Sequence, residues 1–98
     1  MTDVADQLRI VDNSQRHRYE AVLGGRVVGV SQYSLTGDVI TFLHTEVDQS
    51  AAGKGLGSRL AAGALDDVRR RGLKVVARCP FIAAYIRRHG DYADLLAV

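Results

Sequence analysis

The 98-residue chain is short of several features that would fix its class at once. It contains one cysteine, one proline and no tryptophan. A single cysteine cannot form an internal disulfide, which fits a reducing compartment. No run reaches the roughly 18 apolar residues of a membrane span, and the polar start MTDVADQLRIVDN lacks the pattern of a signal peptide. We therefore expect a cytoplasmic protein that does not enter a membrane.

The chain also has little excess of charge of either sign, because the formal net charge is only +2. The length and the 47% hydrophobic content predict one globular domain over residues 1–98. Nine of the thirteen Lys and Arg residues lie from Lys54 to Arg88, which suits either an anionic ligand or a solvated helix face. The basic runs have no interleaved aromatic residues, so nucleic-acid binding is the weakest alternative. No His and Cys residues have the spacing of metal ligands, and no metal site is predicted.

The first half of the chain has the pattern of β-strands. Arg18–Leu23 and Arg26–Leu35 flank Gly24-Gly25, which is a two-residue hairpin signal. Val39–Val47 is rich in β-branched and aromatic residues, and a short strand is expected at Leu8–Val11. These segments predict an antiparallel sheet.

The second half changes to a helical period. Apolar residues recur every four positions from Leu56 to Val68, and Gly72 is a natural stop for this helix. Leu73–Cys79 is one more strand, and a second helix starts at Pro80. Val39–Val47, the first helix and Leu73–Cys79 form a βαβ unit with parallel strands. The fold class is therefore α+β: a mixed, mostly antiparallel sheet with a βαβ unit and two main helices.

Three glycines at alternate positions, Gly53, Gly55 and Gly57, precede the first helix. Neither the Walker A spacing nor the G-x-G-x-x-G dinucleotide spacing is met. A glycine-rich loop that leads into a helix nevertheless presents free N–H groups to a phosphate, with Lys54 and Ser58 as further contacts. The alternative is a tight connection without a ligand.

The loop resembles the phosphate loop of GNAT-type N-acetyltransferases, which runs Gln/Arg-x-x-Gly-x-Gly/Ala. Gly55 and Gly57 occupy the two small positions, and Ala52 stands where Gln or Arg is usual. The likeness extends from Arg18 to Leu96 and is closest to the small single-domain GNAT-like family. That family has a His-Thr strand end, here His44-Thr45, and a Cys-x-Phe/Tyr-x-x-x-Tyr-x-x-x-His pattern, which the chain matches at Cys79, Phe81, Tyr85 and His89.

The resemblance implies acetyl-CoA as co-substrate, bound between the strands Val39–Val47 and Leu73–Cys79. The pantetheine arm would pair with the backbone near Thr45 and Val47, as an added strand does. Arg88 would contact a phosphate. The pyrophosphate would lie on the loop and helix start, at Gly53, Lys54, Gly55, Leu56, Gly57 and Ser58.

Four residues are candidates for catalysis. Cys79 precedes Pro80 and so lies at a helix N-terminus, which stabilises a thiolate; it would take the acetyl group or line the pocket, unless it is simply a small buried residue. Tyr85 would protonate the leaving thiolate of coenzyme A, as in larger relatives, unless it is a core aromatic. His44 and Glu46 share one face of their strand, with Thr45 on the other, and are alternative general bases.

The predicted function is transfer of acetyl from acetyl-CoA to a primary amine, such as a protein lysine or a polyamine, by direct attack or through Cys79. So few residues lie outside the cofactor site that the acceptor pocket must be shallow or borrowed from a partner chain, as in a homodimer. The alternative is a sensor or accessory module that binds CoA or acyl-CoA without turnover.

Overall fold

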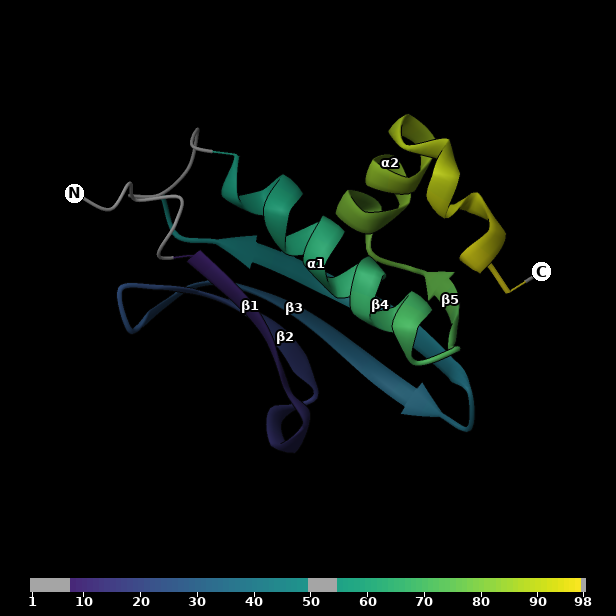
Figure 1. Ribbon diagram of the computed structural model, residues 1–98, viewed down its shortest axis with the longest axis horizontal. Helices are drawn as coiled ribbons and strands as arrows, with labels where there is room; N and C mark the ends of the chain where they lie inside the picture. Colours follow the sequence, from purple (N-terminus) through teal and green to yellow (C-terminus); the bar gives the residue numbers. More distant parts are fainter. Residues whose placement is uncertain (1–7, 50–54, 98) are drawn as a thin grey trace.

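The computed structural model describes residues 8–49 and 55–97 (Figure 1). Five strands form one sheet in the order β1-β2-β3-β4-β5, and the helices follow in the second half of the chain. The elements are β1 (Leu8–Asn13), a 3-10 turn η2 (Ser14–Arg16), β2 (Arg18–Leu23), β3 (Arg26–Thr36), β4 (Val39–Val47), α1 (Leu56–Arg70), β5 (Lys74–Ala77), α2 (Pro80–Arg88) and a 3-10 segment η4 (Gly90–Leu95). The predicted α+β class is confirmed.

The predicted hairpin and the predicted βαβ unit are both present. Gly24 and Gly25 turn β2 into β3 with φ of 57° and 81°, a conformation that a side chain would strain. Strands β1 to β4 are antiparallel, and β4 pairs with β5 in parallel. Strand β5 is shorter than the predicted Leu73–Cys79. The Cys79 amide donates to the Phe42 carbonyl at 2.8 Å, so it does not extend the hydrogen-bond ladder between β4 and β5.

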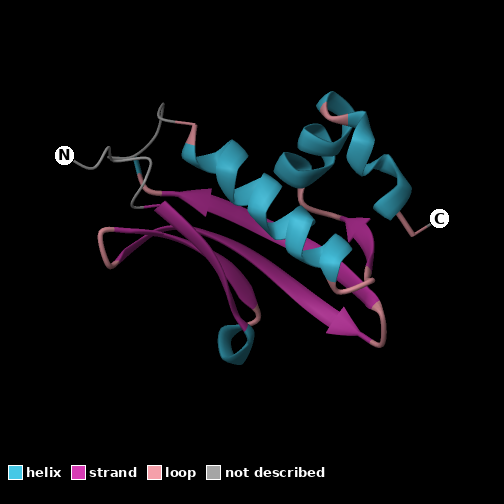
Figure 2. Cartoon of the chain, viewed as in Figure 1, coloured by secondary structure: helices cyan, strands magenta, loops and turns pink. Residues whose placement is uncertain are grey.

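Both helices lie on the same face of the sheet (Figure 2). Helix α1 contacts all five strands, and α2 contacts β4, β5 and α1. Apolar side chains from the inner face of the sheet and from the helices form one core, to which α1 contributes Leu56, Leu60, Ala61, Ala64, Leu65 and Val68. Among the described residues no α-helix covers the opposite face, which we call the open face (Figure 1).

The C-terminal tail packs onto the outer edge of the sheet. Leu96 forms a parallel bridge with Val75, and the Ala97 amide donates to the Val75 carbonyl at 2.8 Å. The tail is also fixed to α1, because the Tyr92 hydroxyl donates to Asp66 at 2.7 Å. Within the described ranges, no helix has the length and apolar character needed to cross a membrane.

Candidate functional site

A β-bulge in β4 decides which side chains reach each face of the sheet. The register with β3 pairs Tyr33 with Phe42 and Gln32 with His44, so Leu43 is an extra residue. As a result Phe42 and Thr45 both face the helices, although they are three residues apart. His44 and Glu46 are exposed, on the open face. The expected sharing of one face by His44 and Glu46, with Thr45 on the other, therefore holds.

Strands β4 and β5 separate into a fork just after this bulge. Their pairing ends at Phe42 and Ala77, whereas β4 continues to Val47. The Asp48 amide donates to the Val28 carbonyl of β3 at 2.7 Å. Because main-chain groups alternate along a strand, those of Thr45 and Val47 point away from β3 and into the fork. Within residues 8–49 and 55–97, no strand pairs with this edge.

A chain of three side chains lies at the base of the fork. Cys79 is the N-cap residue of α2, as predicted, but its thiol makes no cap hydrogen bond. Instead its Sγ lies 3.2 Å from Oγ1 of Thr45, which lies 3.0 Å from Oγ of Ser31. Cys79 is 1% exposed and Ser31 is fully buried. Sequence reasoning missed Ser31, because a serine inside a strand carries no signal of its own.

The amino terminus of α1 offers a row of backbone donors beside the fork. Gly55 is its N-cap residue at φ 72°, and this glycine has no side chain with which to cap the helix. The Arg59 amide donates to the Gly55 carbonyl at 3.1 Å, so the amides of residues 56–58 precede the helical ladder. Such amides, with the helix dipole behind them, bind anions. The predicted contacts Gly53 and Lys54 lie outside the described residues.

A groove of about 200 Å³ joins this helix terminus to α2. Phe81, Tyr85 and Arg88 lie on one face of α2, because their spacing follows the helical repeat, and Ser58 lines the other side of the groove. Gly57 connects the groove to the fork. A Cβ built on it would lie 2.9 Å from Cζ of Phe81 and 3.6 Å from Cγ2 of Val47.

Tyr85 lies in the groove, and its ring stacks on that of His89 with centroids 4.1 Å apart. Tyr85 lies six positions after Cys79, which corresponds to a rise of about 9 Å along the helix axis. Burial, and then the negative charges of Asp66 and Asp91, raise the pKa of the Tyr85 phenol above its usual value of 10.0. The hydroxyl is therefore protonated at neutral pH and available as a proton donor.

His44 and Glu46 form an exposed pair on the open face. Nε2 of His44 lies 3.6 Å from Oε1 of Glu46, and the two side chains are 57% and 69% exposed. The register of β4 places them on the opposite side of the sheet from Thr45 and Cys79. A molecule that reaches His44 must approach across an open surface.

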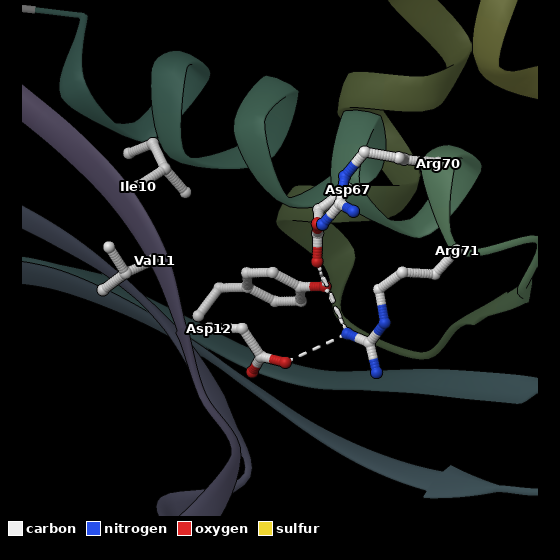
Figure 3. Close-up of a pocket in the computed structure, with 7 residues that line it drawn as sticks. Ile10, Val11, Asp12, Asp67, Arg70 and Arg71 are labelled. Atoms are coloured by element: carbon white, nitrogen blue, oxygen red, sulfur yellow. Dashed lines mark hydrogen bonds and ion pairs between the residues drawn. The ribbon is translucent and has the colours of Figure 1, made fainter.

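A second, larger cavity of about 410 Å³ lies at the other end of α1, between that helix and β1 (Figure 3). Its polar groups are bonded to one another. The Tyr19 hydroxyl donates to Oδ2 of Asp67 at 2.6 Å, and Arg71 donates to Oδ2 of Asp12 at 2.9 Å. Arg70 pairs with the remaining oxygen of Asp67. Two carboxylates thus face two guanidinium groups, and the network fixes the end of α1 to the sheet.

Metal ligands are not brought together in the described part of the chain: it holds no group of three His, Cys, Asp or Glu residues that could bind an ion. The fork, the start of α1 and the groove are instead contiguous, through Val47, Gly57 and Phe81. An open strand edge, the amides at the helix start and the groove therefore lie next to one another.

Comparison with known proteins gives a consistent result. The family model of GCN5-related N-acetyl-transferases matches residues 18–95. The solution structure of a GCN5-like protein from Staphylococcus aureus has a TM-score of 0.70 at 20% identity, over 93% of this chain and 89% of that one. The ribosomal-protein-S18-alanine N-acetyltransferase from Escherichia coli has a TM-score of 0.63 at 17% identity, over 84% of this chain and 52% of that one. No curated protein sequence matches the chain.

Proposed function

The chain belongs to the GCN5-related N-acetyltransferase family, and from this premise we propose that it transfers acetyl from acetyl-CoA to a primary amine. One observation carries the proposal: the fork between β4 and β5 lies next to the start of α1, whose N-cap residue is a glycine without a capping side chain. An elongated ligand with an amide-containing arm and a diphosphate needs those two features side by side.

The fit to coenzyme A follows from the donors and acceptors present. Main-chain groups of Thr45 and Val47 supply the edge along which pantetheine amides pair. The amides of Gly55, Leu56, Gly57 and Ser58 receive the diphosphate, with Gly53 and Lys54 preceding them in the sequence. Arg88 lies in the adjoining groove, where a guanidinium suits a phosphate.

The two reactants approach from opposite faces of the sheet. The thioester lies on the helix side of the fork, near Cys79, and the amine arrives from the open face, where either His44 or Glu46 accepts its proton. The amine nitrogen attacks the thioester carbonyl, so a C–N bond forms as the C–S bond breaks. The departing thiolate takes a proton from Tyr85, whose phenol remains protonated at neutral pH.

Two routes include Cys79, and its burial favours one of them. At 1% exposure and in contact with Thr45, the thiol lines the acyl end of the site in direct transfer. The alternative is a thioester on Cys79, which requires the fork to open. Because the chain has one cysteine, the intact mass after incubation with acetyl-CoA separates these routes: a gain of one acetyl group that disappears in Cys79→Ala marks the covalent route.

The class of acceptor is inferred from the exposure of the candidate bases on the open face. His44 and Glu46 are more than half exposed, so their surroundings do not enclose a small substrate. An accessible amine, such as a protein lysine, suits this surface, and a small polyamine is the second candidate. A partner chain or a second copy of this chain would supply any remaining walls.

The second candidate function is binding of CoA or acyl-CoA without turnover, which the exposed base candidates favour. Isothermal calorimetry with CoA, combined with acetyl-transfer assays on lysine peptides and polyamines, distinguishes the two. Binding together with transfer supports the enzyme. Binding without transfer to any amine supports the sensor, and absence of binding contradicts both.

A further inference from the structure

Ser31 is a fully buried polar residue that the proposed mechanism does not use. It lies on β3 directly opposite Thr45 of β4. The amide of Asp48, three residues after Thr45, donates to β3. Because main-chain groups alternate in direction along a strand, Ser31 and Thr45 form a pair without mutual main-chain hydrogen bonds. Side chains in such pairs approach most closely, and the two hydroxyl oxygens are 3.0 Å apart.

The hydrogen bonds that connect Ser31, Thr45 and Cys79 have a preferred donor-to-acceptor order. Among the described residues, the Ser31 hydroxyl has one hydrogen-bond partner, the hydroxyl of Thr45. A buried O–H without an acceptor is costly, whereas an S–H is a weak donor that loses little when unpaired. The favoured arrangement therefore has Ser31 donating to Thr45 and Thr45 donating to the sulfur of Cys79.

We infer that Ser31 is a positioning residue, which acts through Thr45 by turning the Thr45 proton toward the sulfur at the base of the fork. The inference rests on the proposed function, because the fork is where that function places the acyl group. A sulfur that accepts an O–H hydrogen bond has its lone pairs and any negative charge stabilised. Ser31 thereby keeps the base of the fork in one arrangement, although it does not touch the substrate.

The contrasting interpretation is that Ser31 only fills space in the core. In that case Ser31→Ala would change the free energy of unfolding and leave the Thr45 rotamer unaffected. Positioning predicts something different. Once its partner is removed, the Thr45 hydroxyl exchanges between the sulfur and other acceptors, and its side chain populates more than one χ1 rotamer.

The first measurement uses the protein without CoA. Three-bond couplings to the Thr45 methyl group report its χ1, and they are compared in the wild type, Ser31→Ala and the matched control Ser34→Ala, an exposed serine on the same strand. We expect one rotamer in the wild type and in the control, and averaged couplings in Ser31→Ala. A single unchanged rotamer in Ser31→Ala would overturn the inference.

The second measurement is acetyl transfer. Loss of one hydrogen bond corresponds to a fall in kcat of about three- to tenfold in Ser31→Ala, with KM for acetyl-CoA unchanged. In a Thr45→Val background, Ser31→Ala should have no further effect, and Thr45→Ser should retain most of the activity. An additive loss, or a change in KM alone, would contradict action through Thr45.

The two proposals fail in different ways. If the wild type transfers acetyl to no amine, the proposed function falls, while the Thr45 couplings still decide whether Ser31 positions that hydroxyl. If the wild type is active but Ser31→Ala has normal couplings and normal kcat, only the inference is overturned. Thermal unfolding of each variant verifies that it is folded.

Discussion

Gly57 at the start of α1 and Phe81 at the start of α2 lie so close that a Cβ on Gly57 would be 2.9 Å from Cζ of the Phe81 ring. In Gly57→Ala the partly exposed ring must therefore move, and it moves within the groove that it lines. We expect CoA to bind about tenfold more weakly, which corresponds to about 1.4 kcal/mol.

Calorimetry with CoA measures this effect, and Gly90→Ala is the matched control, because a Cβ there would meet nothing within 4 Å. The helix itself should not suffer, since alanine is a better helix former than glycine by about 1 kcal/mol. Unchanged affinity in Gly57→Ala would show that the groove is not part of the CoA site.

Tyr85 is tested by removing its hydroxyl alone. Tyr85→Phe should lower kcat by about 100-fold or more, as expected for loss of a general acid, while CoA affinity stays near that of the wild type. Because the pKa of Tyr85 is raised, any loss of activity caused by its ionisation should begin at a higher pH than for a free tyrosine phenol. Tyr92→Phe is the control: it loses a hydrogen bond to Asp66 and should affect the free energy of unfolding more than kcat. Equal kcat in Tyr85→Phe and the wild type would exclude the acid role.

His44 and Glu46 are separable because both are exposed and neither supports the core. His44→Ala and Glu46→Gln should each change the free energy of unfolding by less than about 0.5 kcal/mol. Substitution of the residue that serves as the base should lower kcat by about 100-fold at neutral pH. The rate should recover in part as the pH rises, because more of the amine is then unprotonated. Rate profiles from pH 6 to pH 10 distinguish the two, and two unaffected profiles would place the base elsewhere.

The network around Asp67 makes a prediction about stability in acid (Figure 3). Burial alone would raise the pKa of Asp67, but the Tyr19 hydroxyl and Arg70 outweigh it, and the pKa lies below its ordinary 3.8. A carboxyl whose folded pKa is lowered contributes stability that is complete above its unfolded pKa and is lost as the pH falls through the folded value. Asp67→Asn should therefore cost about 1 kcal/mol at pH 7 and less at pH 3.

Urea unfolding at the two pH values measures this difference, and Asp38→Asn in an exposed turn is the control. CoA affinity should be the same in Asp67→Asn and the wild type, because the network lies at the far end of α1 from its amino terminus. A loss of CoA binding would instead connect the second cavity to the ligand site.

Local patterns in the sequence predict much of the fold. The Gly24-Gly25 hairpin and the strand Val39–Val47 follow from turn chemistry and residue type, and both are present as expected. The apolar repeat that begins at Leu56 defines α1, because every fourth residue must reach the same core. The N-cap position of Cys79 follows from the adjacent proline.

The site depends on features that no local pattern contains. Strict alternation from Ile40 and Phe42 would turn His44 inward, and only the bulge at Leu43 reverses this. Ser31 contributes through a cross-strand pair that depends on the register of β3 and β4. The bond between Tyr19 and Asp67 joins residues 48 positions apart, so it is set by packing and not by sequence proximity.

The most direct test of the central claim is a titration of the wild-type protein with coenzyme A, followed by the backbone amide resonances. If the fork and the start of α1 form the binding site, the amides of Gly55 to Ser58 and of Thr45 and Val47 shift together, at one common affinity. The amides of Asp67 and Arg70, at the other end of α1, should stay in place. Saturating coenzyme A that leaves Gly55 to Ser58 unmoved would contradict the account.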